Sequence, residues 1–239
     1  MNISLLCPTR HRPHYLIPLL ESIFDTVHFE QNVEILFAID DDDSSTLHKF
    51  ISLKKWEGRI HGHIRKKSDY LNRDYYNWLS RKASGKYLWA IGDDVRFKTS
   101  DWDTLLIQTI EDYLKTRSDR IAYITTEEDG SQATHTCFPM ITKEAFKAMG
   151  FFLHPELLTW GADRTIYELY SAVNRVINVP SVHIEHVTYH DGKAPCDETA
   201  KSVKERFFRD PDCHNKVSSL VIPKQILLLR KAINEQSSK

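Results

Sequence analysis

Short apolar runs alternate with amphipathic segments along the first ninety residues, and this alternation limits the possible folds more than any other feature of the chain. The predicted strands are residues 3–7, 33–39, 60–64 and 87–91, and the predicted helices between them are residues 15–24, 44–53 and 74–82. Strands that alternate with helices build a parallel sheet with helices on both faces. The pattern therefore predicts an α/β fold, Rossmann-like, with a mostly parallel central sheet.

The regular alternation stops after Asp94. The later chain predicts helices at 102–114, 142–149, 162–173 and 225–234, and strands at 121–125, 137–141 and 176–182. We expect Ser44 or Ser45 to cap the helix 44–53, Thr142 to cap the helix 142–149, and Gly150 to end it. The strand 176–182 is predicted to lie at the edge of the sheet. The most linker-like stretch is about 191–198, so we expect one domain over 1–190 and an extension over 191–239 that packs on it.

Composition excludes several classes of protein. The formal net charge is −1, so no overall positive field points to nucleic acid or an acidic membrane. The four cysteines form no CxxC pair, which favours reduced thiols in a cytoplasmic protein (host cytoplasm, if the chain is viral) and argues against zinc. The chain begins with a strand-like run rather than a signal peptide, and no apolar stretch is long enough for a transmembrane segment.

Acidic residues follow two of the predicted strands. Asp93 and Asp94 come directly after the run 87–91, and the run Asp40 to Asp43 follows the second strand. In open α/β sheets, ligands bind at the carboxyl ends of the strands. Two adjacent carboxylates repel each other unless a cation or a proton lies between them. A divalent metal held for a phosphorylated ligand is one interpretation; a turn is the other, because Gly and Asp both favour turns.

A basic loop follows the first strand at the same predicted edge. Arg10 and Arg12 lie in it, and the planar guanidinium group of arginine binds two phosphate oxygens at once. The alternative is a solvated acidic loop whose charges pair with these arginines. The chain has no GxGxxG after the first strand and no GxxxxGK[ST] anywhere, so side chains and a metal rather than a glycine-rich loop would hold the phosphates.

These segments together resemble a known family. The order Cys7-Pro-Thr-Arg10, Ala38-Ile-Asp-Asp41, Asn77 to Gly85 and Ile91-Gly-Asp-Asp94 is similar to that of GT-A fold glycosyltransferases, in particular glycosyltransferase family 2. The resemblance covers about the first hundred residues and continues only through short motifs. It implies a nucleotide-sugar half at about 1–98 and an acceptor half at about 99–190.

The resemblance also implies roles for residues of the first half. The residues expected to bind the nucleotide sugar are Pro8, Thr9, Arg10, Arg12, Asp40, Asp42, Arg73 and Asp93. For Arg73 the alternative is an ordinary surface charge. Asp94, the last acid of the DXD-like motif, is the expected metal ligand, with Mn²⁺ or Mg²⁺ as the ion. A strict DxD would have an acid at Gly92, and this chain has none.

Two later motifs complete the expected site. Trp160-Gly-Ala-Asp163 resembles the loop that carries the catalytic base, which removes the proton of the acceptor hydroxyl; the alternative is that Asp163 only caps a helix. The segment His183 to Pro195 resembles the late histidine-containing segment of these enzymes, and a neutral imidazole completes the coordination of such an ion. His186 is the favoured second metal ligand because it immediately follows the strand and Glu185, and His190 is the alternative. Lys193 would neutralise the departing diphosphate.

The resemblance implies a metal-dependent hexosyl- or pentosyltransferase that uses a nucleotide diphosphate sugar, most often a UDP-sugar, and inverts the anomeric carbon. The acceptor hydroxyl would lie on a glycan, a lipid-linked saccharide, a protein or a modified nucleobase. Two alternatives stay open: a nucleotidyltransferase that acts on a sugar phosphate, and a catalytically degenerate sugar-binding module. The basic amphipathic segment 224–231 suits a membrane surface, nucleic acid or a helix packed on the domain.

Overall fold

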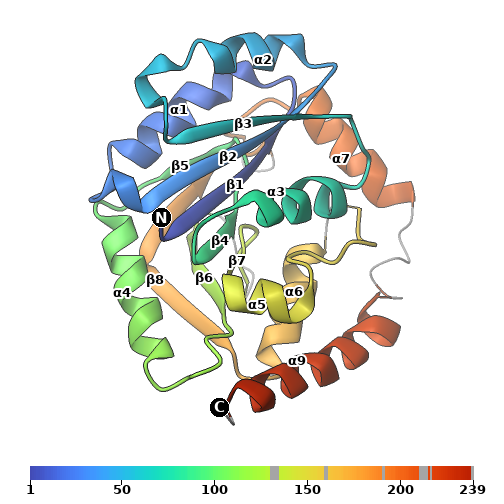
Figure 1. The fold of residues 1–239 in the computed structure, drawn as a ribbon. Coiled ribbons are helices and arrows are strands. Elements are labelled where there is room, and N and C mark those ends of the chain that lie inside the picture. The colour runs from blue at the N-terminus through green and yellow to red at the C-terminus, as the bar shows by residue number, and fades with distance from the viewer. Residues whose placement is uncertain (130–134, 159–160, 190–191, 210–214, 216, 238–239) are drawn as a thin grey trace.

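The computed structural model describes residues 1–129, 135–158, 161–189, 192–209, 215 and 217–237. Within these residues, eight strands form one sheet in the order β3-β2-β1-β4-β7-β6-β8-β5 (Figure 1). The strands are β1 (Ile3–Thr9), β2 (Val33–Asp40), β3 (Ile60–Arg65), β4 (Tyr87–Ala90), β5 (Val95–Phe97), β6 (Tyr123–Glu128), β7 (Met140–Thr142) and β8 (Val176–His186). The first four in the order are parallel, which confirms the predicted α/β fold with a mostly parallel sheet.

Helices cover both faces of the sheet, as the alternation predicts (Figure 1). They are α1 (Pro13–Phe24), α2 (Ser44–Ile51), α3 (Asn77–Lys82), α4 (Trp102–Leu114), α5 (Lys143–Met149), α6 (Ala162–Ser171), α7 (Glu198–Arg209) and α9 (Ile222–Ser237). Trp89 and Trp102 lie in the core on the side of α1, α2 and α4. Leu88 and Tyr123 lie in the core on the side of α3, α5 and α6. Burial of each such side chain stabilises the fold by roughly 1.5–3 kcal/mol.

The register of the parallel strands brings the predicted site residues to one edge. Thr9 at the end of β1 lies opposite Ile39 near the end of β2, and Leu6 lies opposite Ala90, the last residue of β4. The chain therefore leaves β1, β2 and β4 at the same edge of the sheet. This is the edge at which ligands bind in open α/β sheets.

The structure corrects the prediction that 176–182 is an edge strand. β8 runs from Val176 to His186 and lies inside the sheet, parallel to β6 and antiparallel to β5. Its pairing with β6 shifts register between Thr126 and Glu127, so the strand continues past an irregularity near Pro180. The sequence pattern predicts only residues 176–182 because the strand is irregular in its middle.

Three local expectations also change. The cap of α2 is Asp43 rather than Ser44 or Ser45, because its carboxylate accepts the Thr46 N–H. A π-helical turn, η3 (Leu71–Tyr76), precedes α3 where one helix over 74–82 was predicted. β7 begins at Met140 rather than at 137. Thr142 caps α5, and Gly150 ends it at φ 75°, as predicted.

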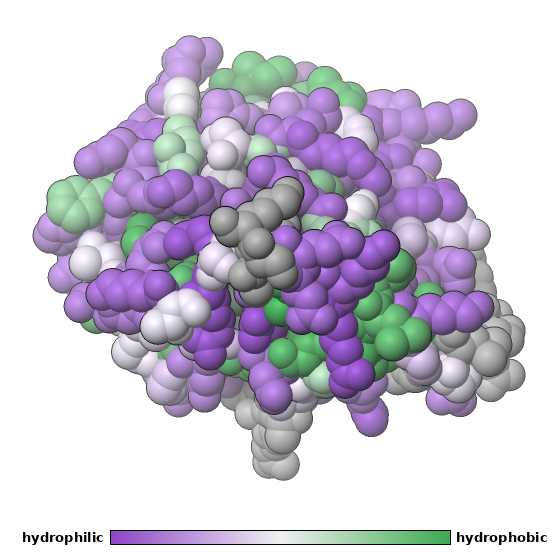
Figure 2. Space-filling model, turned by 60° about the horizontal axis from the view of Figure 1, so that its bottom comes forward, coloured by the Kyte–Doolittle hydropathy of each residue, from purple (hydrophilic) through white to green (hydrophobic). Residues whose placement is uncertain are grey.

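The last helix, α9, packs on the domain through one face only. Leu229 is fully buried and lies with Ile166 of α6 in the same core, whereas Leu227 and Leu228 are 65% and 59% exposed. Figure 2 shows a mostly hydrophilic face with hydrophobic side chains between polar ones. Among the described residues, no helix combines the length and apolar character that crossing a membrane requires.

Candidate active site

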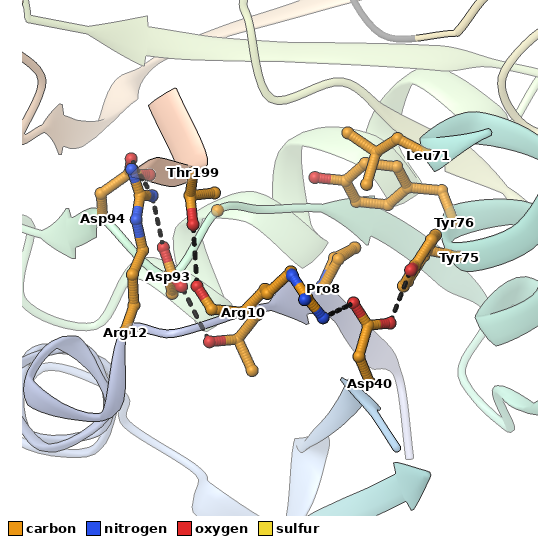
Figure 3. Close-up of a pocket in the computed structure, with 12 residues that line it drawn as sticks. Pro8, Arg10, Arg12, Asp40, Leu71, Tyr75, Tyr76, Asp93, Asp94 and Thr199 are labelled. Atoms are coloured by element: carbon orange, nitrogen blue, oxygen red, sulfur yellow. Dashed lines mark hydrogen bonds and ion pairs between the residues drawn. The ribbon is translucent and has the colours of Figure 1, made fainter. Parts of the chain in front are cut away.

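The loop after β1 brings Arg10 to the acids that follow β2. Arg10 forms an ion pair with Asp40 at 2.7 Å and contacts both carboxylate oxygens of Asp42, one of them at 2.9 Å. Asp40 also accepts a hydrogen bond of 2.5 Å from the Tyr75 hydroxyl. Pro8 and these side chains, apart from Asp42, line a cavity of about 150 Å³ (Figure 3). The cavity therefore has a polar wall from β2 and an aromatic wall from η3.

Asp93 and Asp94 follow β4 at the other end of this cavity, and Arg12 bridges them. Arg12 Nη1 lies 3.0 Å from Asp93 Oδ1 and 3.0 Å from Asp94 Oδ2, and the Thr9 hydroxyl donates to Asp93 at 2.8 Å (Figure 3). Burial and the charge of Asp94 raise the pKa of Asp93. Burial also opposes ionisation of Asp94, but contacts with His186 and the charge of Arg12 bring its pKa below the ordinary value. Asp94 is thus the more readily ionised acid of the pair.

The glycine at position 92 has a steric reason. A Cβ atom on Gly92 would lie 2.4 Å from Asp94 Oδ1, a separation at which one of the two groups must move. The Asp94 carboxylate therefore lies against the backbone of Gly92, and a side chain at that position would require Oδ1, the oxygen that faces His186, to move. The departure from a strict DxD is part of how Asp94 is placed.

His186 reaches Asp94 through the register of β8. It is the last residue of the strand and lies opposite Val95, the residue after Asp94. Its Nε2 lies 3.6 Å from Asp94 Oδ1, and its Nδ1 lies 3.3 Å from Glu128 Oε1. Burial opposes protonation of the ring, but contacts with Asp94, Cys137 and Glu128 raise the pKa of His186 to about 11. The imidazole is thus held between two carboxylates.

Asp163 faces the same space from α6. Gly161, with φ 82°, holds the N-cap position, so Asp163 lies in the first turn of α6. Asp163 Oδ2 lies 3.5 Å from His135 Nε2. A cavity of about 260 Å³ is lined by Asp163, Asp94 and His186 among others. The fold therefore brings three separately predicted residues to one cavity.

Four residues of the predicted motifs lie elsewhere or outside the description. Arg73 is exposed, pairs with Asp74 at 3.0 Å and lies over the Tyr70 ring. Lys193 pairs with Glu185 at 3.0 Å. Neither lines the two cavities above, as far as the described residues define them. His190 and Trp160 lie outside the described residues.

Several residues of the site were not predicted. Tyr75 and Tyr76 of η3 line the first cavity, and Thr199 of α7 closes its other side. Glu128 is the one with a usable signal, since it belongs to an acidic run that ends β6 as the predicted acids end β2 and β4. Thr199 carries no local signal because its contact, a hydrogen bond of 2.9 Å to the Arg10 carbonyl, joins distant segments.

Comparison with solved structures identifies the fold. TarS from S. aureus in complex with UDP superposes with a TM-score of 0.58 and 13% identity, over 100% of this chain and 72% of that one. The mannosyltransferase PcManGT from Pyrobaculum calidifontis, in complex with GDP-Man and Mn²⁺, superposes with a TM-score of 0.61 and 13% identity, over 99% of this chain and 75% of that one. GalNAc-T7, in complex with UDP, GalNAc and Mn²⁺, superposes with a TM-score of 0.62 and 13% identity, over 93% of this chain and 58% of that one.

No protein-family profile and no curated protein sequence matches the chain. At such low identity the structural likeness establishes the fold alone, and that fold is GT-A. The resemblance drawn from the first hundred residues is thereby confirmed at the level of the fold. The narrower resemblance to family 2 stays a prediction.

Proposed function

We propose that the protein is a metal-dependent glycosyltransferase that moves a sugar from a nucleotide diphosphate sugar to an acceptor hydroxyl with inversion. One observation carries the proposal: Asp163 and the Asp94–His186 pair face the same cavity, beside the arginine loop. An acid that accepts a proton and a pair that holds a cation are the two parts this reaction requires. The likeness to structures with UDP, UDP-GlcNAc or GDP-Man supports the donor class.

The residues at Asp94 fit a divalent ion. A carboxylate and an imidazole nitrogen that has released its proton are donors that Mn²⁺ or Mg²⁺ accepts; the two atoms lie 3.6 Å apart, and the site is partly buried. The acid pair already attracts a cationic group, because Arg12 lies between Asp93 and Asp94. When bound, the ion supplies positive charge for the leaving diphosphate. Glu128 Oε1 lies 3.3 Å from Nδ1 of His186, and this contact directs Nε2 toward Asp94.

The chain's own groups then have distinct tasks. The base and ribose of the donor bind against the wall formed by Tyr75, Asp40 and Arg10. We propose a UDP-sugar as the donor. In the proposed complex Thr9 donates a hydrogen bond to the diphosphate, and Arg12 neutralises its growing charge. Asp163 accepts the proton of the acceptor hydroxyl as that oxygen attacks the anomeric carbon from the opposite side. Arg73 and Lys193 stand outside this set in the present arrangement.

The test is a thermal-shift screen of nucleotide sugars with Mn²⁺ and, separately, with EDTA. We expect one donor to raise the melting temperature only when Mn²⁺ is present, because a ligand that binds the native state stabilises it by mass action. Asp94→Asn should abolish this metal-dependent increment. Stabilisation of equal size in EDTA would contradict the metal role. Release of nucleoside diphosphate identifies sugar transfer, whereas pyrophosphate would identify a nucleotidyltransferase.

A further inference from the structure

The imidazole of His186 belongs to a second group of possible metal-binding atoms, besides its pair with Asp94. Glu128, Cys137 and His186 each offer one ligand atom, and these atoms lie within 4.8 Å of one another. They come from β6, from the segment before β7, and from the end of β8, so no sequence spacing reveals them. The absence of a CxxC pair excludes a local zinc motif, but not a site assembled in this way.

The cluster is held in place and is open to ions. The backbone N–H of Cys137 donates to Glu128 Oε2 at 2.8 Å, and the Thr136 hydroxyl donates to the same oxygen at 3.2 Å. The Glu128 side chain is 3% exposed, whereas Cys137 is exposed and lines the cavity that holds Asp94 and Asp163. Its thiol also interacts with the His186 ring. An ion can therefore reach the thiol from the cavity, while the carboxylate is fixed behind it.

We propose that Glu128, Cys137 and His186 form a second cation site, selective for a thiophilic divalent ion such as Zn²⁺ or Co²⁺. A tetrahedral ion with these donors holds its ligand atoms about 3.5 Å apart, so only a small closure of the cluster is needed. Thiolate is a soft ligand that Mg²⁺ and Mn²⁺ avoid and Zn²⁺ and Co²⁺ accept. As the ion binds, the thiol and the ring nitrogen each lose any proton they carry to solvent.

Occupation of this site has a consequence for the proposed transfer activity, and this consequence rests on the function proposed above. Nδ1 faces Glu128 and Nε2 faces Asp94, so one ring serves both sites. An ion held by Glu128 and Cys137 draws the ring toward them and away from Asp94. A thiophilic ion would then inhibit a reaction that depends on a harder ion at Asp94.

Cobalt tests the site without any nucleotide sugar. Co²⁺ alone is titrated into the reduced, full-length protein, and the near-ultraviolet charge-transfer band of a thiolate–cobalt bond is recorded. We expect the band in the wild type and in Cys196→Ser, which removes another exposed thiol, and its complete loss in Cys137→Ser. Glu128→Gln should keep the band but require more Co²⁺ to reach it, which supports the site even if one variant folds poorly.

Two results would overturn the proposal: no band in the wild type, or an unchanged band in Cys137→Ser. Neither depends on glycosyl transfer, so a failure of the proposed function leaves this test intact. Where the Mn²⁺-dependent donor reaction is present, Zn²⁺ should inhibit the wild type and inhibit Cys137→Ser much less. Equal inhibition of both proteins would contradict the inhibitory role.

Discussion

Arg12 is the side chain on which the charges of the site converge. It contacts Asp93, Asp94 and Asp197, and it forms a two-pronged ion pair with the last of these through Nε at 2.7 Å and Nη2 at 3.0 Å. Burial opposes its charge, but the Asp197 hydrogen bonds and the charges of Asp93 and Asp94 raise the pKa of Arg12 above its ordinary value. The guanidinium group of Arg12 therefore already neutralises the acid pair. A divalent ion at Asp94 would have to bind beside this group or displace it.

Asp163 carries the sharpest prediction at the scale of one residue. Asp163→Asn is nearly isosteric and lies at the cavity surface, so the variant should fold and bind donor with Mn²⁺ as the wild type does. Because the amide cannot accept the proton of the attacking hydroxyl, turnover should fall by about 10²- to 10⁴-fold. Release of nucleoside diphosphate measures turnover, and thermal shift measures donor binding. Near wild-type turnover in this variant would remove Asp163 from the mechanism.

At the scale of elements, Asp43 joins two segments of the site. Its Oδ1 accepts the Thr46 N–H at 3.1 Å and caps α2, and its Oδ2 accepts the His11 N–H at 2.6 Å from the arginine loop. Burial opposes ionisation, but hydrogen bonds from Thr46, His11 and Ser45 lower the pKa of Asp43 to about 2. One carboxylate therefore sets both where α2 begins and where the loop lies.

Asp43→Ala should lower the free energy of unfolding at pH 7 by about 1–2 kcal/mol, as loss of a cap does. The pKa is depressed in the folded state, so the contribution of the charge is complete above the unfolded value of about 3.9. It is lost as pH falls toward 2. Urea unfolding at pH 7, 5 and 3 should therefore show the difference between wild type and variant narrow at pH 3.

Asp41→Ala is the matched control, because Asp41 is exposed in the same loop and its backbone N–H, not its side chain, bonds to Arg65. We expect this variant to change stability by less than about 0.5 kcal/mol. A difference for Asp43→Ala that stays constant from pH 7 to pH 3 would mean that its charge contributes nothing.

Strands and helices with strong patterns were predictable, and elements defined by distant partners were not. The apolar runs of β1, β2 and β4 were predictable because these strands are buried on both faces, whereas β3 lies at the sheet edge and buries only Ile60. β5 has three residues and exists through pairing with β8, so no local pattern marks it. Asp94 and His186 were predicted from their places after strands, whereas Cys137 and Thr199 reach the site only through the tertiary fold.

At the scale of the whole molecule, the last fifty residues contribute to both the core and the site. Asp197 and Thr199 bind the arginine loop, whereas Leu229 of α9 is fully buried with the residues of α6. Those contacts join segments that lie far apart in the chain. The region predicted as an extension thus lies against the loop of Arg10 and Arg12 at one end and the core at the other.

Two neighbouring leucines of α9 test how much the helix contributes to the fold. Leu229→Ala should lower the free energy of unfolding by about 2–5 kcal/mol, because it leaves a cavity in the core. Leu228→Ala removes the same atoms from an exposed side chain and should change it by less than about 0.5 kcal/mol. Urea unfolding of both proteins provides the comparison. Equal effects would show that α9 is not part of the cooperative unit.

The interior position of β8 has a consequence for the order in which the molecule can assemble. Within the described residues, β5 has β8 as its sheet partner, although the paired residues Val95 and His186 lie 91 positions apart in the chain. Closing so long a loop has an entropic cost that local contacts do not offset beforehand. While the polypeptide is being synthesised, β5 and the outer edge of β6 therefore have no sheet partner until β8 has been made. Asp94 and His186 come together only then, so their contact is among the late ones to form.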